Sequence, residues 1–124
     1  MNILIVEDEE MVAEVLIKAL KEWGQKVVWV TTMHEALAKT RQSIFDMVIL
    51  DIMLPDGFGY DIIPEIKQSQ PEAYVITMTG DNSPQLERIV RGFGIAYFMA
   101  KPVNLKELKS IIDHYINRLA KKVA

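Results

Sequence analysis

Three short apolar runs of this chain each end in charged residues of a kind that binds metals and phosphates. Residues 3–6 lead into Glu7 and Asp8, residues 47–50 into Asp51, and residues 96–100 into Lys101. Continuous apolar runs of this length are typical of strands buried on both faces of a parallel sheet. Because ligands of such sheets bind beyond the carboxyl ends of the strands, we expect these carboxylates and this ammonium to meet at one edge.

Neighbouring carboxylates repel each other, so a fold that gathers them is expected to hold a cation. Carboxylates without cysteine or clustered histidine suit Mg²⁺, which prefers six oxygen ligands and keeps several waters. Asp8 and Asp51 would supply carboxylates, and Glu7 would bind through water. Lys101 and the hydroxyl of Thr79, also at a strand end, suit phosphate oxygens. Since an aspartate can act as a nucleophile and form an aspartyl phosphate, these residues predict a magnesium-dependent phospho-acceptor site.

Positioning these side chains requires strands and helices in alternation, and the sequence shows that pattern five times. We expect strands at residues 3–6, 26–30, 47–51, 73–78 and 96–100, each followed by apolar residues at helical spacing. The helix boundaries are marked by Gly24, the Thr32–Glu35 capping box, Ser83-Pro84, Gly94, and Asn104 with Glu107. Pro64 must fall in the first turn of the third helix.

Five such units predict an α/β fold, a doubly wound parallel sheet of five strands with helices on both faces. Right-handed crossovers limit the topologies, but the pattern alone leaves the strand order open. Residues 55–59, which contain proline and two glycines, are expected to form a turn-rich loop.

Composition limits the classes of protein to consider. The chain has 124 residues, of which 50% are hydrophobic and 25% charged, as in an ordinary globular domain. Its net charge of -3 offers no basic face for nucleic acid, and the absence of cysteine excludes disulfides and thiolate metal sites. We find neither a signal peptide nor an apolar run of the about 20 residues that a membrane span needs. We expect one soluble, cytoplasmic domain over residues 1–124, bound directly to neither nucleic acid nor membrane.

In its ordered motifs the sequence resembles the receiver domain of two-component response regulators, of the chemotaxis-regulator type. The resemblance covers essentially the whole chain and rests on four motifs: Val6-Glu7-Asp8, residues 51–57, Thr79-Gly80 and Lys101-Pro102. It implies that Asp51 accepts a phosphoryl group from the phosphohistidine of a histidine kinase or phosphotransfer protein. It also implies that Glu7 and Asp8 hold Mg²⁺ together with Asp51 and the backbone carbonyl of Met53.

The resemblance further implies a flavodoxin-like three-layer sandwich with strand order 2-1-3-4-5, and a switch. Thr79 and Lys101 would contact the phosphoryl group, and Phe98 would be the switch aromatic. The fourth helix, fifth strand and fifth helix, within residues 84–112, would form the face that controls a partner or output domain. Phe98 lacks the tyrosine hydroxyl of many family members, which changes the form of the switch and leaves phospho-acceptance intact. A monomer or a phosphorylation-dependent dimer is expected.

Two other functions compete with this interpretation. A receiver-like domain could bind partners without phosphorylation, although the five intact site residues argue against it. An enzyme would need motifs that the sequence lacks. A nucleotide-binding fold needs a glycine-rich loop after the first strand, but residues 7–10 there are all acidic. An aspartate-nucleophile phosphatase needs a second aspartate two residues after the first, where Met53 stands. We therefore expect no enzymatic activity beyond the domain's own phosphorylation and dephosphorylation.

Other conspicuous residues have plainer interpretations. Glu9 and Glu10 are interpreted as an acidic helix start, favoured by the helix dipole. His34 and His114 are expected on exposed helix surfaces. Trp23 and Trp29 are expected to pack in or over the core, and most of the methionines are expected to fill it.

Overall fold

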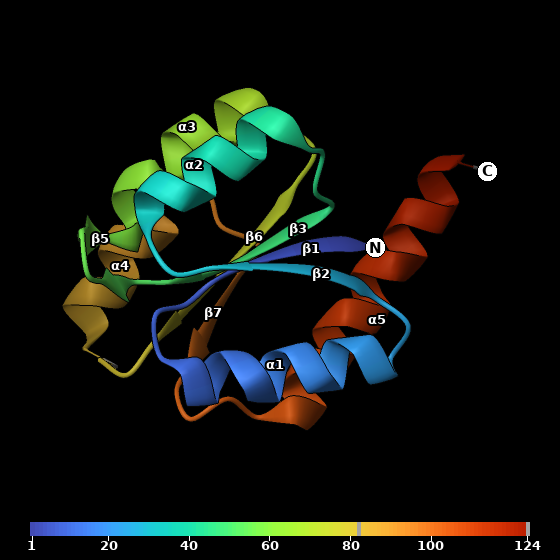
Figure 1. Ribbon diagram of the computed structural model, residues 1–124, viewed down its shortest axis with the longest axis horizontal. Coiled ribbons are helices and arrows are strands. Elements are labelled where there is room, and N and C mark those ends of the chain that lie inside the picture. The colour runs from blue at the N-terminus through green and yellow to red at the C-terminus, as the bar shows by residue number, and fades with distance from the viewer. Residues whose placement is uncertain (82, 124) are drawn as a thin grey trace.

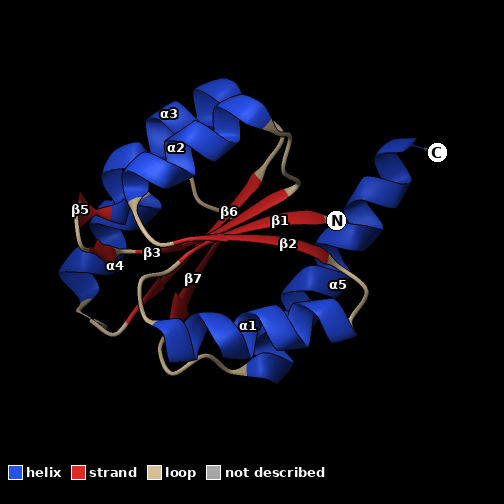
Figure 2. Cartoon of the chain, viewed as in Figure 1, coloured by secondary structure: helices blue, strands red, loops and turns tan. Residues whose placement is uncertain are grey.

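One parallel sheet organises the molecule, and the computed structural model describes it within residues 1–81 and 83–123. Its strands are arranged in the order β2-β1-β3-β6-β7 and are shown in red in Figure 2. Their bounds are Asn2–Val6 for β1, Lys26–Val30 for β2, Met47–Asp51 for β3, Tyr74–Thr79 for β6 and Tyr97–Ala100 for β7. Counted within the sheet alone, this is the predicted order 2-1-3-4-5, and every strand pair is parallel, so both predictions are confirmed.

Helices cover both faces of the sheet, which confirms the predicted three-layer arrangement. In Figure 1, α1 and α5 lie on one side of the strands, and α2, α3 and α4 lie on the other. Their bounds are Glu10–Glu22 for α1, Met33–Gln42 for α2, Ile63–Ser69 for α3, Pro84–Arg91 for α4 and Leu105–Val123 for α5. A short 3-10 turn, η1 (Gly59–Ile62), precedes α3.

The core is divided by the sheet into two apolar layers, because alternate residues of each strand point to opposite faces. Ile3 and Ile5 of β1 pack with residues of α1 and α5 such as Leu16 and Ile112. Leu4 packs on the other face, in a cluster that includes residues of α2 and α3. All five residues of β3 are buried, which explains why residues 47–50, before Asp51, are a continuous apolar run rather than an alternating pattern.

The predicted helix starts are confirmed by their hydrogen bonds. The side chains of Thr32, Ser83 and Asn104 accept hydrogen bonds from backbone N–H groups in the first turns of α2, α4 and α5, at 3.1, 3.3 and 3.1 Å. Pro64 lies in the first turn of α3, as its missing N–H requires. The end of α4 differs from prediction, because the helix stops at Arg91 and is capped by Gly92, two residues before Gly94.

Two further short strands lie at the turn-rich loop predicted at residues 55–59, one just before it and one within it. β4 (Met53–Leu54) and β5 (Gly57–Phe58) pair as a small antiparallel hairpin directly after Asp51. Each strand has only two residues, which is too short for a periodicity signal to appear in the sequence. The hairpin lies at the end of the sheet where β3 stops (Figure 1).

None of the helices formed by residues 1–81 and 83–123 is long and apolar enough to cross a membrane.

Candidate functional site

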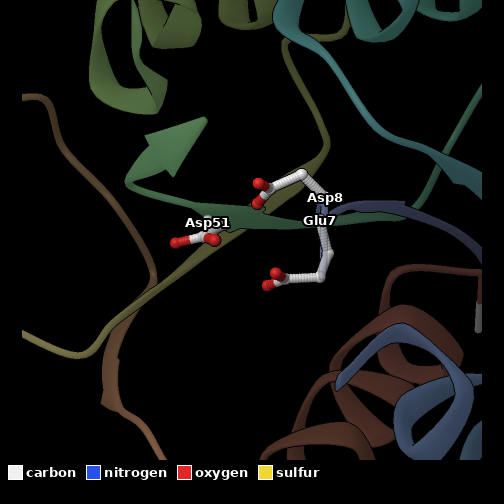
Figure 3. A group of neighbouring side chains, drawn as sticks. All are labelled: Glu7, Asp8 and Asp51. Carbon is white, nitrogen blue, oxygen red and sulfur yellow. The ribbon is translucent and has the colours of Figure 1, made fainter. Parts of the chain in front are cut away.

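Three carboxylates gather where β1 and β3 end, as the sequence predicts. Asp51 is the last residue of β3 and only 2% exposed, and Glu7, which follows β1, is fully buried. Asp8 is exposed. Each of the three offers an oxygen atom within 4.8 Å of the others. Figure 3 shows Glu7 and Asp8 leaving the chain in opposite directions, with both carboxyl groups turned toward Asp51. The parallel register of β1 and β3 brings these ends together.

Lys101 reaches this cluster from the end of β7. Its backbone N–H donates to the carbonyl of Thr79 at 2.9 Å, which continues the ladder between β6 and β7 to the site. Its ammonium Nζ lies 3.0 Å from Asp51 Oδ2 and 2.9 Å from Glu7 Oε2. Burial alone would lower the pKa of the Lys101 ammonium, but its contacts with Glu7 and Asp51 overcome this and raise that pKa, so the charge is permanent.

Glu7 has the most perturbed carboxyl group of the site. Burial raises its pKa from 4.5 to about 7, the neighbouring charge of Asp51 adds to the rise, and the ammonium of Lys101 opposes it. Glu7 Oε1 accepts a hydrogen bond from the N–H of Glu9 at 3.0 Å. Glu7 Oε2 forms its ion pair outside hydrogen-bonding geometry, and no group in the described part of the chain donates a hydrogen bond to it. A buried acceptor oxygen of this kind keeps hydrogen-bonding capacity that the surrounding protein groups do not use.

The hairpin after β3 fixes the carboxylate of Asp51. The N–H of Met53 donates to Asp51 Oδ1 at 3.2 Å, so each carboxylate oxygen has a donor of its own. Gly59 packs against the backbone here, and a Cβ added to it would lie 2.1 Å from the carbonyl oxygen of Asp51. The Met53 side chain is exposed, which is consistent with a role for its backbone rather than its side chain.

Thr79 and Phe98 occupy neighbouring strands on the other side of β3. Thr79 is buried at the end of β6, and its hydroxyl oxygen accepts a hydrogen bond from the N–H of Asp81 at 3.0 Å, which leaves the hydroxyl proton available to an acceptor. Phe98 is half-buried in β7, and the guanidinium of Arg91 in α4 lies 5.8 Å from the centre of its ring. This cation–π distance links the ring to α4.

Two residues contribute more to the site than their sequence context suggested. Glu9 is not only an acidic helix start, because its Oε1 lies 3.4 Å from the Nζ of Lys101, although its side chain is 63% exposed. Trp29, expected to pack on the core, is 36% exposed, and its indole N–H donates to the carbonyl of Glu7 at 2.7 Å. Neither contact has a sequence signal, because both join residues far apart along the chain. His34 and His114 are exposed, as predicted.

The site as a whole fits a small divalent cation and a phosphoryl group. An open depression of about 520 Å³ is lined by Asp8, Glu9, Asp51, Met53, Asp81 and Lys101, among others. Its oxygen donors are the ligands that hard cations such as Ca²⁺ and Mg²⁺ accept. Lys101 supplies positive charge at the same carboxylate, which suits a phosphate oxygen.

Comparisons with known proteins point to a single family. The sequence model of the response regulator receiver domain matches residues 3–113. The swarming motility regulation protein RssB of Serratia marcescens is 32% identical over 97% of this chain and 55% of its own length. The DNA-binding transcriptional regulator NtrC of Azospirillum brasilense is 29% identical over 94% of this chain and 24% of its own length. The chain thus spans about half the length or less of these curated relatives.

Solved structures agree in fold. The crystal structure of a CheY-like response regulator receiver domain protein from Methanospirillum hungatei JF-1 superimposes with a TM-score of 0.90 at 27% identity, covering 98% of this chain and 97% of that one. The strand order, the acidic edge and the family match therefore agree, and the chain belongs to the response regulator receiver domain family of two-component signal transduction.

Proposed function

We propose that Asp51 is the phospho-acceptor of this receiver domain. The observation that carries the proposal is the placement of one buried carboxylate next to both the ammonium of Lys101 and two further carboxylates, Glu7 and Asp8. Asp51 would attack the phosphorus of a phosphohistidine, forming a P–O bond as the P–N bond breaks, and the imidazole would keep the bonding electron pair and take a proton from solvent. Lys101 would hold a phosphoryl oxygen throughout.

We further propose that Asp8, Asp51 and the backbone carbonyl of Met53 hold Mg²⁺, with Glu7 bound through water. The acidic cluster and the hydrogen-bonding capacity left on Glu7 Oε2 support this assignment. When bound, Mg²⁺ would supply positive charge next to the phosphoryl oxygens. The protein's own contribution is positional, since the N–H of Met53 and the Nζ of Lys101 hold the two oxygens of Asp51.

Thr79, Lys101 and Phe98 are proposed to couple phosphorylation to the face formed by α4, β7 and α5. Three observations support this path: the free proton of the Thr79 hydroxyl, the backbone bond from Lys101 to Thr79, and the contact of Arg91 with Phe98. A shift of Thr79 toward a phosphoryl oxygen would move the end of β6, and β7 pairs with that strand.

The proposed partners are a histidine kinase or phosphotransfer protein as donor, and an output domain or separate protein as receiver of the signal. Relatives that are longer than this chain support the second assignment. We propose that residues 1–124 form one receiver domain, a monomer or a phosphorylation-dependent dimer. Its chemistry would be limited to its own phosphorylation and dephosphorylation.

The test is phosphate uptake from acetyl phosphate in the presence of Mg²⁺, followed by intact mass. The parent should gain one phosphate that is stable in acid and lost in base, as expected for an aspartyl phosphate. Asp51→Asn keeps the shape of the side chain and removes the nucleophile, so it should gain none. Asp113→Asn is the matched control, because Asp113 is an exposed aspartate paired with Lys109 on α5.

Uptake by Asp51→Asn at the parent rate would show that another residue is the acceptor. A parent protein that takes up no phosphate with Mg²⁺ present would instead favour an interaction module that works without phosphorylation. Size-exclusion chromatography of the same samples before and after phosphorylation tests the oligomeric state.

A further inference from the structure

The carboxylate of Asp56 forms a contact that the site described above does not use. Asp56 lies in the turn between β4 and β5, three residues beyond Met53. Its Oδ1 accepts a hydrogen bond from the N–H of Met33 at 3.0 Å, and its Oδ2 accepts one from the N–H of His34 at 3.1 Å. Both N–H groups belong to the first turn of α2, where the helix dipole favours a negative charge.

This contact is additional to the cap that α2 already has. Thr32 is the N-cap of α2 and accepts from the N–H of Glu35 at 3.1 Å. The slight burial of Asp56 would raise its carboxyl pKa, but the hydrogen bonds from Met33 and His34 overcome this and lower it. The helix thus has one cap from its own sequence and a second from a residue more than twenty positions away.

The hairpin depends on outside contacts to hold its position. β4 and β5 have two residues each, and an isolated two-stranded hairpin is marginally stable at best. Gly57, beside Asp56 in the turn, has φ +139, and a Cβ added there would lie 2.8 Å from the Cε of Met33. Two consecutive turn residues therefore rest against the start of α2. At the other end of the hairpin, the N–H of Gly59 donates to the carbonyl of Ile52 at 2.7 Å.

The part of the hairpin nearest the site is Met53. It pairs with Phe58 across the hairpin, and its N–H holds Asp51 Oδ1 at 3.2 Å. The position of Met53 is therefore set from both sides, by Asp51 within the sheet and by the turn that Asp56 ties to α2. A displacement of the turn would change the direction of the N–H and carbonyl groups of Met53.

We infer that Asp56 is a positioning residue for the phosphorylation site: by tying the β4–β5 turn to the first turn of α2, it holds the backbone of Met53 in place beside Asp51. The inference rests on the proposed function, because it makes Asp56 a support of the loop that carries Met53, a proposed ligand of the cation, beside Asp51, the proposed phospho-acceptor. Asp56 itself is assigned no contact with the cation or the phosphoryl group.

The experiment compares Asp56→Ala, Asp56→Asn and Thr32→Ala with the parent. Asp56→Ala removes both hydrogen bonds, and Asp56→Asn keeps one acceptor oxygen. Thr32→Ala removes the cap that α2 has of its own, together with the bond from the Thr32 hydroxyl to Glu35, and leaves the contacts of Asp56 in place. The readouts are hydrogen exchange at the N–H of Met53 without metal, the Mg²⁺ affinity by titration calorimetry, and the rate of phosphate uptake from acetyl phosphate. The first readout does not depend on metal or on phosphorylation.

We expect Asp56→Ala to exchange the Met53 N–H faster, to bind Mg²⁺ roughly tenfold more weakly, as is typical when a supporting residue of a metal site is lost, and to take up phosphate more slowly. Asp56→Asn should lie between Asp56→Ala and the parent in all three. Thr32→Ala should lower the melting temperature and leave the Mg²⁺ affinity and Met53 exchange at parent values.

Two results would overturn the inference. One is an Asp56→Ala protein, or an Asp56→Asn protein if the alanine variant does not fold, with Met53 exchange and Mg²⁺ affinity equal to those of the parent. The other is an equal loss of Mg²⁺ affinity in Thr32→Ala, which would mean that the stability of α2 alone is responsible. Either result leaves parent phosphorylation intact, whereas a parent that binds no Mg²⁺ and takes up no phosphate contradicts the proposed function and this inference with it.

Discussion

At the scale of single residues, the site holds more negative than positive charge, and its carboxylates differ in how deeply they are buried. Three carboxylates gather at this edge, where Lys101 is paired with Glu7 and Asp51, but Asp8 is exposed while Glu7 and Asp51 are buried. Water screens Asp8, so its charge has little effect on the metal-free fold. Glu7 bears most of the strain, as the rise of its pKa to about 7 indicates. Functional sites are often strained in this way.

The first prediction follows from the sign of that shift. The pKa of Glu7 is about 7 in the folded protein and 4.5 in the reference state, so the fold prefers the protonated form. In chelator, the free energy of unfolding should therefore fall as pH rises from about 4.5 to 7, relative to Glu7→Gln, which cannot ionise. Above pH 7 Glu7→Gln should be the more stable by roughly 1–3 kcal/mol, and near pH 4 the two should differ little.

Urea unfolding of both proteins across this pH range measures the difference. A gap between the two proteins that stays constant from pH 4 to 8 would mean that Glu7 is not perturbed. A parent more stable than Glu7→Gln at pH 8 would mean that its ion pair with Lys101 outweighs its burial.

At the scale of elements, the ends of strands position the site and short connections hold it. β1, β3, β6 and β7 each deliver a residue to the same edge, because parallel strands end at the same side. The turn from β3 through the hairpin into η1 is tightly packed at Gly59. Gly59 is buried there against the backbone carbonyl of Asp51.

The second prediction concerns this crowding. A Cβ at position 59 would lie 2.1 Å from the Asp51 carbonyl oxygen, so the backbone must move to admit it. Gly59→Ala should lower the free energy of unfolding by roughly 2 kcal/mol or more, in the range of overpacked sites, and should slow phosphate uptake because Asp51 moves. Gly80→Ala is the control, since no atom lies within 4 Å of a Cβ built there.

Denaturant unfolding gives the stability of the two variants, and phosphate uptake from acetyl phosphate gives their phosphorylation rates. If Gly59→Ala and Gly80→Ala have the same stability and the same uptake rate as the parent, the close approach at Gly59 has no consequence for the site.

The third prediction concerns the elements that carry the signal. Phe98 on β7 lies under the guanidinium of Arg91 on α4, and β7 is paired with β6, which ends in Thr79. Phosphorylation should therefore change amide chemical shifts mainly at the site and within residues 84–112. Phe98→Ala should reduce the changes in α4 and leave those near Asp51. NMR spectra before and after phosphorylation test this, and changes confined to α1 and α2 would contradict it.

At the scale of the whole molecule, cation binding and folding stability are linked. Any ion that binds the folded state and not the unfolded one stabilises it by RT ln(1 + [L]/Kd), which is about 2.7 kcal/mol at a hundred times Kd. The acidic site needs the fold to bring residues 7, 8 and 51 together, so the unfolded chain cannot reproduce it. Magnesium should therefore raise the stability of this protein in a concentration-dependent way.

The fourth prediction tests that linkage. Mg²⁺ should raise the melting temperature of the parent and do much less for Asp8→Asn, which loses a proposed ligand. Because Asp8 is exposed, Asp8→Asn should melt close to the parent in chelator. Asp113→Asn should respond to Mg²⁺ as the parent does. Equal Mg²⁺ shifts for Asp8→Asn and the parent would exclude Asp8 as a ligand.

Much of this molecule is readable from its sequence, for local physical reasons. Buried strands appear as apolar runs because both of their faces are covered, and the runs at β1 and β3 predict where Asp51 and the acid pair emerge. The caps of α2, α4 and α5 join residues three positions apart, so Thr32, Ser83 and Asn104 can be recognised as caps from the sequence alone. The motif order indicated the family, and with it the strand order that the pattern alone left open.

Only the tertiary structure decided the contacts between distant segments. The rise in the pKa of Glu7 depends on how deeply it is buried and on the exact approach of Lys101, neither of which is encoded in nearby residues. The bonds of Asp56 to α2 and of Trp29 to Glu7 join residues more than twenty positions apart, and the hairpin strands are too short to show a period. Local sequence patterns indicate which face of a strand or helix is buried. Contacts between distant segments arise only when the strands assemble and their carboxyl ends meet at one edge of the sheet.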